Sequence, residues 1–261
     1  MKPTAAALAL LLTAAGAPAQ DRGQSAAADP RRSGLAYLSP ATQALQRDDT
    51  LNPGMLWVAD GASRWKEPAG APRRSCAGCH GEAGTSMRGV AARYPALDEP
   101  SGQVFTLQQR IAACRSIHQQ APAGRGDDEV LLALTTFVAH QSRGEPIRPA
   151  RGAALDAAAV RGQRQWQQPF GQLAMSCAMC HDTLAGARLA GSAISQAHPT
   201  GYPSYRLEWQ AVGTLERRMR NCMTGVRAEP FGNGAPEWTA LEVFLMRRAA
   251  GMPLETPSVR P

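Results

Sequence analysis

The sequence is poor in aromatic side chains and in long apolar runs. Phe, Trp and Tyr make up 5% of its 261 residues, against 25 glycines and 20 prolines. A core of protein side chains alone would be thin at this composition, so we expect large buried cofactors to complete it. Past the N-terminus no stretch approaches the roughly 18 to 20 apolar residues that a membrane helix needs. We therefore expect no membrane span.

The chain also lacks a basic stripe interleaved with stacking aromatics, which a nucleic-acid-binding surface would need. Its formal charge is +7, but the arginines that supply it are dispersed along the sequence. Such a balance suits a small anion or an acidic protein partner better than a nucleic acid. We expect no nucleic-acid partner.

The first residues have the pattern of an export signal. Lys2 gives a positive start, residues 5–15 form a short apolar run, and Ala17-Pro18-Ala19 offers a cleavage site. Residues 1–19 are therefore predicted to be a signal peptide, and the mature protein to be exported. An uncleaved N-terminal anchor is the alternative.

Four of the six cysteines fall in two C-x-x-C-H motifs, at residues 76–80 and 177–181. This spacing is the attachment pattern of c-type haem, and the histidine that follows presents a ring nitrogen to the iron. A redox dithiol or half of a zinc site is the alternative. The cysteines predicted to form haem thioethers are Cys76, Cys79, Cys177 and Cys180. The predicted iron ligands are His80 and His181.

The chain repeats itself around these motifs. A tryptophan stands 11 residues before the first cysteine of each, at Trp65 and Trp166. Further on, residue types and intervals match between the two halves: Tyr94-Pro95, Thr106, Arg110 and Cys114 against Tyr202-Pro203, Thr214, Arg218 and Cys222. The repetition predicts an all-α fold of two duplicated cytochrome c-like domains with one haem each, at residues 20–150 and 151–261.

Local signals agree with helices at matched places. Thr106 and Gln109 form a capping-box pattern, and residues 128–142 and 237–249 are predicted to be the closing helix of each half. The segment 146–152 holds two prolines and a glycine and is the predicted seam between the domains. No convincing strand run is present.

No sequence motif identifies the second axial ligand of each haem. Met87, His118, Met223 and Met246 are possible ligands, but none recurs at matched positions. Cys114 and Cys222 do recur, and thiolate is a soft, electron-donating ligand that lowers the potential. We therefore predict cysteine ligation at both haems. A disulfide between the two cysteines, or two plain buried thiols, remain as alternatives.

The second half carries arginines that the first half lacks. Arg227 corresponds by spacing to Gln119 and Arg248 to Gln141, while Arg218 matches Arg110 and could equally bind a haem propionate. Planar guanidinium groups are well matched to sulfur oxyanions. The arginines therefore favour Cys222 as a reactive sulfur beside a haem, within an anion site.

These motifs together resemble SoxA, the dihaem subunit of the SoxAX cytochromes of bacterial sulfur oxidation. The resemblance covers most of the mature chain and includes both haem motifs. Its other segments are Asn52-Pro-Gly-Met-Leu-Trp57, Gly89-Val-Ala-Ala-Arg-Tyr-Pro95, Arg218-x3-Cys222-x4-Arg227, Gly251-x-Pro253 and Glu255-Thr-Pro257. The arginine-cysteine segment is the specific part, since the haem motifs alone fit many cytochromes.

The resemblance implies a periplasmic L-cysteine S-thiosulfotransferase with two covalent haems. It implies a monohaem partner, SoxX, and a reaction that joins thiosulfate to a cysteine of the SoxYZ carrier, releasing two electrons. Cys222 would be the persulfide-modified, haem-coordinating sulfur, and thiosulfate would be held by Arg218, Arg227 and Arg248. The haem of His80 and Cys114 would be a spectator. The alternatives are a dihaem electron-transfer cytochrome without bond-forming chemistry and a dihaem peroxidase.

Overall fold

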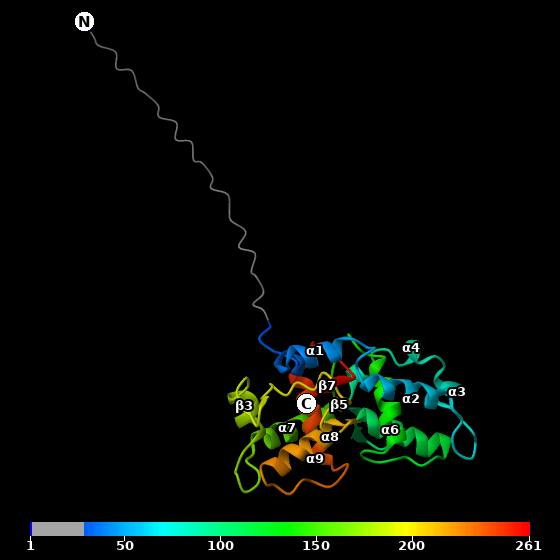
Figure 1. Ribbon diagram of the computed structural model, residues 1–261. Coiled ribbons are helices and arrows are strands. Elements are labelled where there is room, and N and C mark those ends of the chain that lie inside the picture. The colour runs from blue at the N-terminus through cyan, green and yellow to red at the C-terminus, as the bar shows by residue number, and fades with distance from the viewer. Residues whose placement is uncertain (2–28) are drawn as a thin grey trace. The chain divides into compact units, whose positions relative to one another are not determined.

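The computed structural model describes residues 29–261 together with Met1. Its main architectural elements are two pairs of packed helices (Figure 1). Residues 31–261 cluster as one unit by their contacts. Except for Met1, the predicted signal peptide lies outside the described residues. Among the described residues no helix is long and apolar enough to cross a membrane.

The fold is largely helical. The helices before residue 150 are η1 (Gly34–Tyr37), α1 (Pro40–Arg47), α2 (Gly54–Lys66), α3 (Cys76–His80), α4 (Ala83–Ser86), η2 (Ala91–Arg93), α5 (Leu107–Cys114), η3 (Arg115–Gln119) and α6 (Glu129–His140). Those after it are α7 (Ala153–Gln167), η4 (Met179–Thr183), α8 (Leu215–Gly225) and α9 (Pro236–Arg248). The closing helices therefore lie within a few residues of the predicted segments.

Small sheets join the helices, so the prediction of an all-α fold is wrong in this respect. The strands are β1 (Ala96–Asp98), β2 (Gln103–Phe105), β3 (Arg188–Leu189), β4 (Ser192–Ala193), β5 (Ser204–Arg206), β6 (Ala211–Gly213) and β7 (Ser258–Arg260). Hairpin β1-β2 leads into α5, and hairpin β5-β6 leads into α8. Strands of two or three residues are too short to show an alternating pattern in the sequence.

The same local interactions begin the matched helices. The Thr106 hydroxyl accepts from the Gln109 amide, and the Gln109 side chain accepts from the Thr106 amide, so the predicted capping box is confirmed. Thr214 caps α8 by accepting from the amide of Arg217 at 3.0 Å. Both caps satisfy amides that a helix start leaves without partners, and they fix where the cysteine-bearing helices begin.

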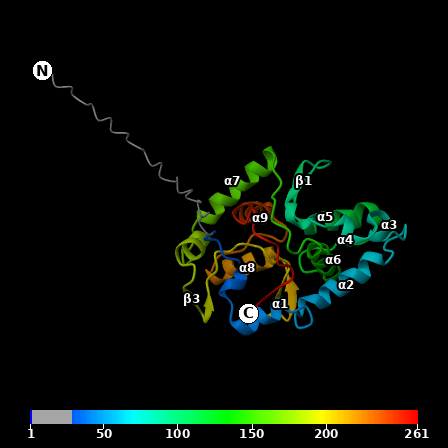
Figure 2. The ribbon, with the colours of Figure 1, turned by 90° about the horizontal axis from the view of Figure 1, so that it is seen from above.

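Each helix pair is drawn together by a glycine. Helix α2 packs along α6, and α7 packs along α9 (Figure 2). A Cβ atom on Gly61 of α2 would collide with the carbonyl oxygen of Ala133, and one on Gly162 of α7 with that of Ala240. The glycines lie four residues, about one helical turn, before Trp65 and Trp166. The close contact between the helices therefore also fixes the position of each tryptophan along its helix pair.

Alanine at Gly162 is expected to lower the free energy of unfolding by about 1 to 3 kcal/mol, because α7 must move away from α9 to admit the methyl group. Urea denaturation of the protein with its cofactors bound measures this. Gly225, whose Cβ position meets nothing within 4 Å, provides the control. Its replacement by alanine should be neutral or stabilising by less than about 1 kcal/mol. Equal effects at both positions would contradict the packing argument.

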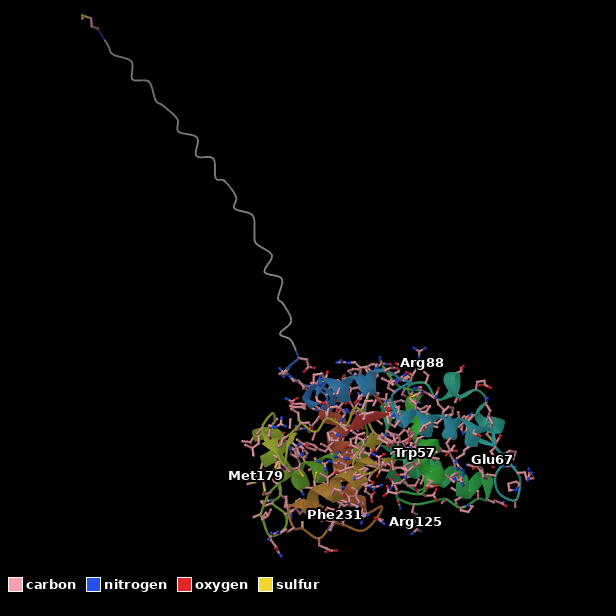
Figure 3. All side chains as sticks on the ribbon, viewed as in Figure 1. Trp57, Glu67, Arg88, Arg125, Met179 and Phe231 are labelled. Atoms are coloured by element: carbon pink, nitrogen blue, oxygen red, sulfur yellow. The ribbon has the colours of Figure 1, made fainter. Side chains whose placement is uncertain are left out.

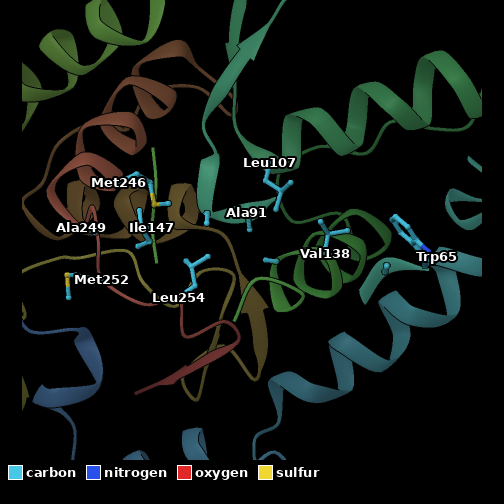
Figure 4. Packing of buried hydrophobic residues seen from close by; sticks show 12 residues of the cluster. Trp65, Ala91, Leu107, Val138, Ile147, Met246, Ala249, Met252 and Leu254 are labelled. Atoms are coloured by element: carbon cyan, nitrogen blue, oxygen red, sulfur yellow. The ribbon is translucent and has the colours of Figure 1, made fainter. Parts of the chain in front are cut away.

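The predicted seam is not an exposed linker. Ile147 is 1% exposed and its amide donates to the carbonyl of Met252 at 2.9 Å. It belongs to an apolar cluster, shown in Figure 4, that takes Leu107 and Val138 from before the seam and Met246 from after it. The domain boundary therefore stays a prediction, and the two halves share core residues.

A small cavity of about 80 Å³ is lined by matched residues of both halves, among them Tyr94 and Tyr202. Glu242 and Glu216 also face it. Burial raises the pKa of Glu242 to about 8, and the Glu216 carboxylate adds to the rise. The folded protein therefore keeps a neutral carboxyl group at Glu242 near neutral pH.

This raised pKa should reduce stability at alkaline pH. Below the ordinary pKa of 4.5 both folded and unfolded states are protonated at Glu242; as pH rises toward 8, only the unfolded state ionises, so the free energy of unfolding falls. We expect Glu242→Gln to match the parent near pH 4 and to exceed it by about 2 to 4 kcal/mol at pH 9. Denaturation across this range tests it. The exposed Glu229→Gln control should follow the parent curve throughout.

Candidate functional site

The first C-x-x-C-H motif forms the short helix α3. Ser75 precedes it, and its hydroxyl accepts a hydrogen bond from the Gly78 amide at 2.9 Å. The Trp65 ring packs beside the His80 ring with 5.7 Å between centroids, and its Nε1 donates to the Gly81 carbonyl at 3.0 Å. The histidine therefore rests against a tryptophan that the α2-α6 contact holds in place.

A cavity of about 430 Å³ adjoins this motif. Its lining includes the motif side chains Cys76, Cys79 and His80, and Cys114 from α5. Apolar side chains make much of the remaining wall: Trp65, Val90, Leu107, Ile111, Leu134 and Val138. The arginines there are Arg74, Arg110 and Arg115. This lining fits a covalent haem. It offers two thiols for the thioethers, an imidazole and a further thiol for the iron, an apolar wall for the ring, and arginines for the propionate carboxylates.

The second motif continues into a single turn of π-helix, η4, where the first forms an α-helix. The Ser176 hydroxyl accepts from the Met179 amide at 3.2 Å, as Ser75 does in the first motif. Met179 lies within the motif and is 47% exposed at the surface (Figure 3). The second motif therefore reaches the outside of the molecule.

His181 is held more tightly than a surface histidine. Its Nδ1 lies 2.7 Å from the Ser195 carbonyl oxygen, and its ring stacks on Trp166 with 5.6 Å between centroids. Burial lowers the pKa of His181. A neutral ring that donates through Nδ1 leaves Nε2 to bind a metal, which is how haem and metal sites orient their histidines.

Cys222 lies half-buried on α8 beside this motif. Burial raises the pKa of the Cys177 thiol to about 11, and the neighbouring Cys222 thiol adds to the rise. In the same way, the Cys114 thiol contributes to the raised pKa of Cys76, after the larger effect of burial. All six cysteines are free. Each helix cysteine thus belongs with its own motif, which contradicts a disulfide between Cys114 and Cys222.

The two predicted arginine ligands nearest Cys222 in sequence have no acidic partner among the described residues. Arg218 precedes Cys222 by one helical turn on α8 and is half-buried. Arg227 is exposed and has a left-handed backbone with φ 57°. An uncompensated guanidinium group one helical turn from a thiol, as at Arg218, forms an environment suited to an anion.

Arg227 corresponds to Gln120 rather than to Gln119 as the spacing suggested. Gln120 is the residue with left-handed backbone after α5, at φ 52°. The left-handed residue comes six positions after Cys114 but five after Cys222, so the segment that contains the π-helical turn η3 has one residue more, and this shifts the alignment by one. Arg227 still has no charged counterpart in the first half.

Arg248, the third predicted thiosulfate ligand, is already paired. Its guanidinium donates to the Asp182 carboxylate at 2.6 Å and lies 4.7 Å from the centroid of the Trp166 ring. The structure thus places Arg248 with the tryptophan that supports His181. Of the other candidate ligands, Met87 and His118 line the larger cavity, whereas Met223 and Met246 are buried in apolar clusters.

Known proteins resemble this chain both in sequence and in fold. A family model described as the SoxA/TsdA cytochrome c domain matches residues 60–147 and 161–254. The chain belongs to the SoxA family. The L-cysteine S-thiosulfotransferase subunit SoxA of Rhodovulum sulfidophilum is 35% identical, over 89% of this chain and 81% of that protein. The namesake subunit of Pseudaminobacter salicylatoxidans is 34% identical, over 89% and 82%.

The fold agrees with the SoxA family as well. The crystal structure of SoxXA from P. pantotrophus superimposes with a TM-score of 0.85 at 30% identity, over 88% of this chain and 87% of that chain. The match to a cytochrome c domain implies covalent haem c as the cofactor, and the lining of the cavity beside α3 fits a cofactor of that class.

One charge in this SoxA-family site escaped the sequence comparison. Arg110 in the first half is neutralised by Asp98 at the end of β1, at 2.5 Å. At the matching end of β5 stands Arg206, paired instead with Glu208 at 2.8 Å. The second half therefore has a positive charge, Arg206, where the first half has the negative charge of Asp98, and Arg218 is left without a carboxylate partner. The interval that relates Arg110 to Arg218 also relates Asp98 to Arg206, and comparing these two would have found it.

Proposed function

We propose that this SoxA-family protein is a periplasmic dihaem cytochrome subunit that conjugates thiosulfate to a cysteine of the SoxYZ carrier, in a complex with the monohaem cytochrome SoxX. The observation that carries the proposal is the half-buried Cys222 beside the second motif, with the unpaired Arg218 one turn before it. The names of the relatives and of the SoxXA structure support the activity and the partner.

Each half would hold one haem with its own residues. In the first, Cys76 and Cys79 would form the thioethers, and His80 and Cys114, which line the same cavity, would be the iron ligands. In the second the corresponding residues are Cys177, Cys180, His181 and Cys222. When bound, the haem supplies an acceptor for single electrons. This arrangement is the duplicated pair of domains, 20–150 and 151–261, that the repeated sequence predicts.

The reaction forms one S–S bond. The sulfane sulfur of thiosulfate joins the sulfur of the carrier cysteine, the thiol proton leaves to solvent, and the two electrons lost by the sulfur atoms would pass to the haem acceptor and on to SoxX. Arg218 and Arg227 hold the dianion and offset its repulsion of an incoming thiolate. Cys222, carrying an additional sulfur as a persulfide, stands where the bond forms.

The direct test uses the native complex with its partner cytochrome. Incubation with thiosulfate and the carrier should raise the mass of the carrier by one thiosulfonate adduct, removable by a thiol reductant. Peptide mass analysis should find two haems and an additional sulfur on Cys222. Reduction of the partner cytochrome with no change in carrier mass would identify a plain electron-transfer cytochrome instead.

Low-temperature EPR separates the ligand sets. His/thiolate ligation at both irons should give low-spin signals distinct from those of His/Met ligation. A His/Met signal from the second haem would overturn the ligand role of Cys222. Strong peroxide turnover by the isolated protein would favour the peroxidase alternative.

A further inference from the structure

A charged pair lies over the tryptophan that supports His181. The Asp182 carboxylate accepts from Trp166 Nε1 at 2.7 Å through one oxygen and from Arg248 Nη2 at 2.6 Å through the other. The Arg248 guanidinium lies 4.7 Å from the Trp166 ring centroid and 5.7 Å from that of Phe244. Three contacts therefore fix this guanidinium, and its planar face is covered by aromatic rings.

The first half has the same stack without the charges. Trp65 packs on His80 at 5.7 Å, close to the 5.6 Å between Trp166 and His181. Where the second half has Asp182, the first has Gly81, whose backbone carbonyl accepts from Trp65.

The partner position differs as well. Gln141 stands in place of Arg248, and its amide donates to the Phe137 carbonyl. The haem support is thus common to both halves, and the ion pair is an addition to the half that carries Cys222.

We propose that Asp182 and Arg248 are positioning residues that lock Trp166 against His181 and shift the reduction potential of the second haem in opposite directions, and that Arg248 is not a thiosulfate ligand. The proposal rests on the proposed function only in taking His181 as the haem ligand. It separates the arginines by their partners: Arg218 has no carboxylate among residues 29–261, whereas Arg248 has one.

The signs of the two charges make the proposal testable. A carboxylate next to the proximal histidine favours the oxidised, more positive iron, and a guanidinium favours the reduced iron. Together they nearly cancel. Removing one charge should therefore shift the potential in the direction set by the other, and removing both should return it close to the parent value.

A charge cycle in the purified complex measures this. Asp182→Asn should raise the potential of the second haem, Arg248→Gln should lower it, and the double variant should lie close to the parent. Potentiometric titration followed by EPR distinguishes the two haems, and the first should not shift. Arg248→Lys, which keeps the charge without the planar stacking, should recover most of the potential while broadening the EPR signal of the second haem.

The neighbouring pair of Arg247 and Asp156 provides a matched control. It joins α9 to α7, at 2.5 Å, but touches neither Trp166 nor His181 in the hydrogen bonds and ring contacts of the described residues. Arg247→Gln should leave both potentials unchanged. Shifts equal to those of Arg248→Gln would mean that general loosening of α9 is responsible, which would overturn the proposal.

The opposite assignment of Arg248 predicts a different pattern. If it holds thiosulfate, Arg248→Gln should raise KM for thiosulfate with the potential unchanged, and Asp182→Asn should not compensate. Failure of the proposed function would appear elsewhere, as a parent complex that never modifies the carrier while the potentials still follow the charge cycle.

Discussion

Replacing Cys222 by serine is expected to lower the rate of thiosulfate conjugation to the carrier by at least about 100-fold. A hydroxyl cannot carry a persulfide sulfur and is too hard to serve as a comparable iron ligand. Cys222 is also the one cysteine of α8, and the structure places it beside Cys177 of the second motif. The measurement is the mass of the carrier after timed incubation with thiosulfate, in the complex with SoxX.

Cys114→Ser is the control, because Cys114 has the matching position on α5. It should change the EPR signature of the first haem and reduce conjugation far less. Similar losses from both substitutions would mean that the helix cysteines act through the stability of the shared core, and the catalytic assignment of Cys222 would fail.

Replacing Arg218 by glutamine is expected to raise KM for thiosulfate by about 10- to 100-fold, with a smaller effect on kcat. A charge-assisted hydrogen bond to an anion is worth roughly 1.5 to 3 kcal/mol, which gives this range. Arg218 can provide it because no carboxylate of residues 29–261 competes for its guanidinium. Steady-state kinetics over a range of thiosulfate concentrations tests the expectation.

Two further variants test whether the absence of a carboxylate partner at Arg218 affects KM for thiosulfate. Arg110→Gln removes the matched arginine of the first half, which Asp98 already neutralises, and should leave KM unchanged. Arg206→Asp recreates at β5 the acid that the first half has at β1, so it should pair with Arg218 and raise KM nearly as much as Arg218→Gln does. An unaltered KM in Arg206→Asp would show that the sign change at this strand is irrelevant to the anion.

The features that sequence alone predicted are those with a short, local cause. The capping box at Thr106 and the helix limits near 128–142 and 237–249 depend on residue types at fixed spacings. Such spacings survive in the folded chain because a helix converts them directly into positions on one face.

What the sequence missed depends on contacts between distant segments or on one inserted residue. Asp182 and Arg248 are separated by 66 positions, and no periodicity relates them. The π-helical turn after Cys114 adds one residue to a helix end, so the alignment of Arg227 was wrong by one position. The strands escaped because pairs of two or three residues carry no period that can be recognised.

The shared core has a consequence for the haem that is proposed to take no part in the reaction. The cluster around Ile147 joins Trp65, which supports His80, to Met246 on the helix that carries Arg248. A cofactor lost from the first motif would open the cavity beside α5 and loosen packing that the second half also uses. Under the proposed function, a haem that takes no part in electron transfer would still be kept by selection for its structural role, because the cysteine proposed to react lies on a core that this haem helps to fill.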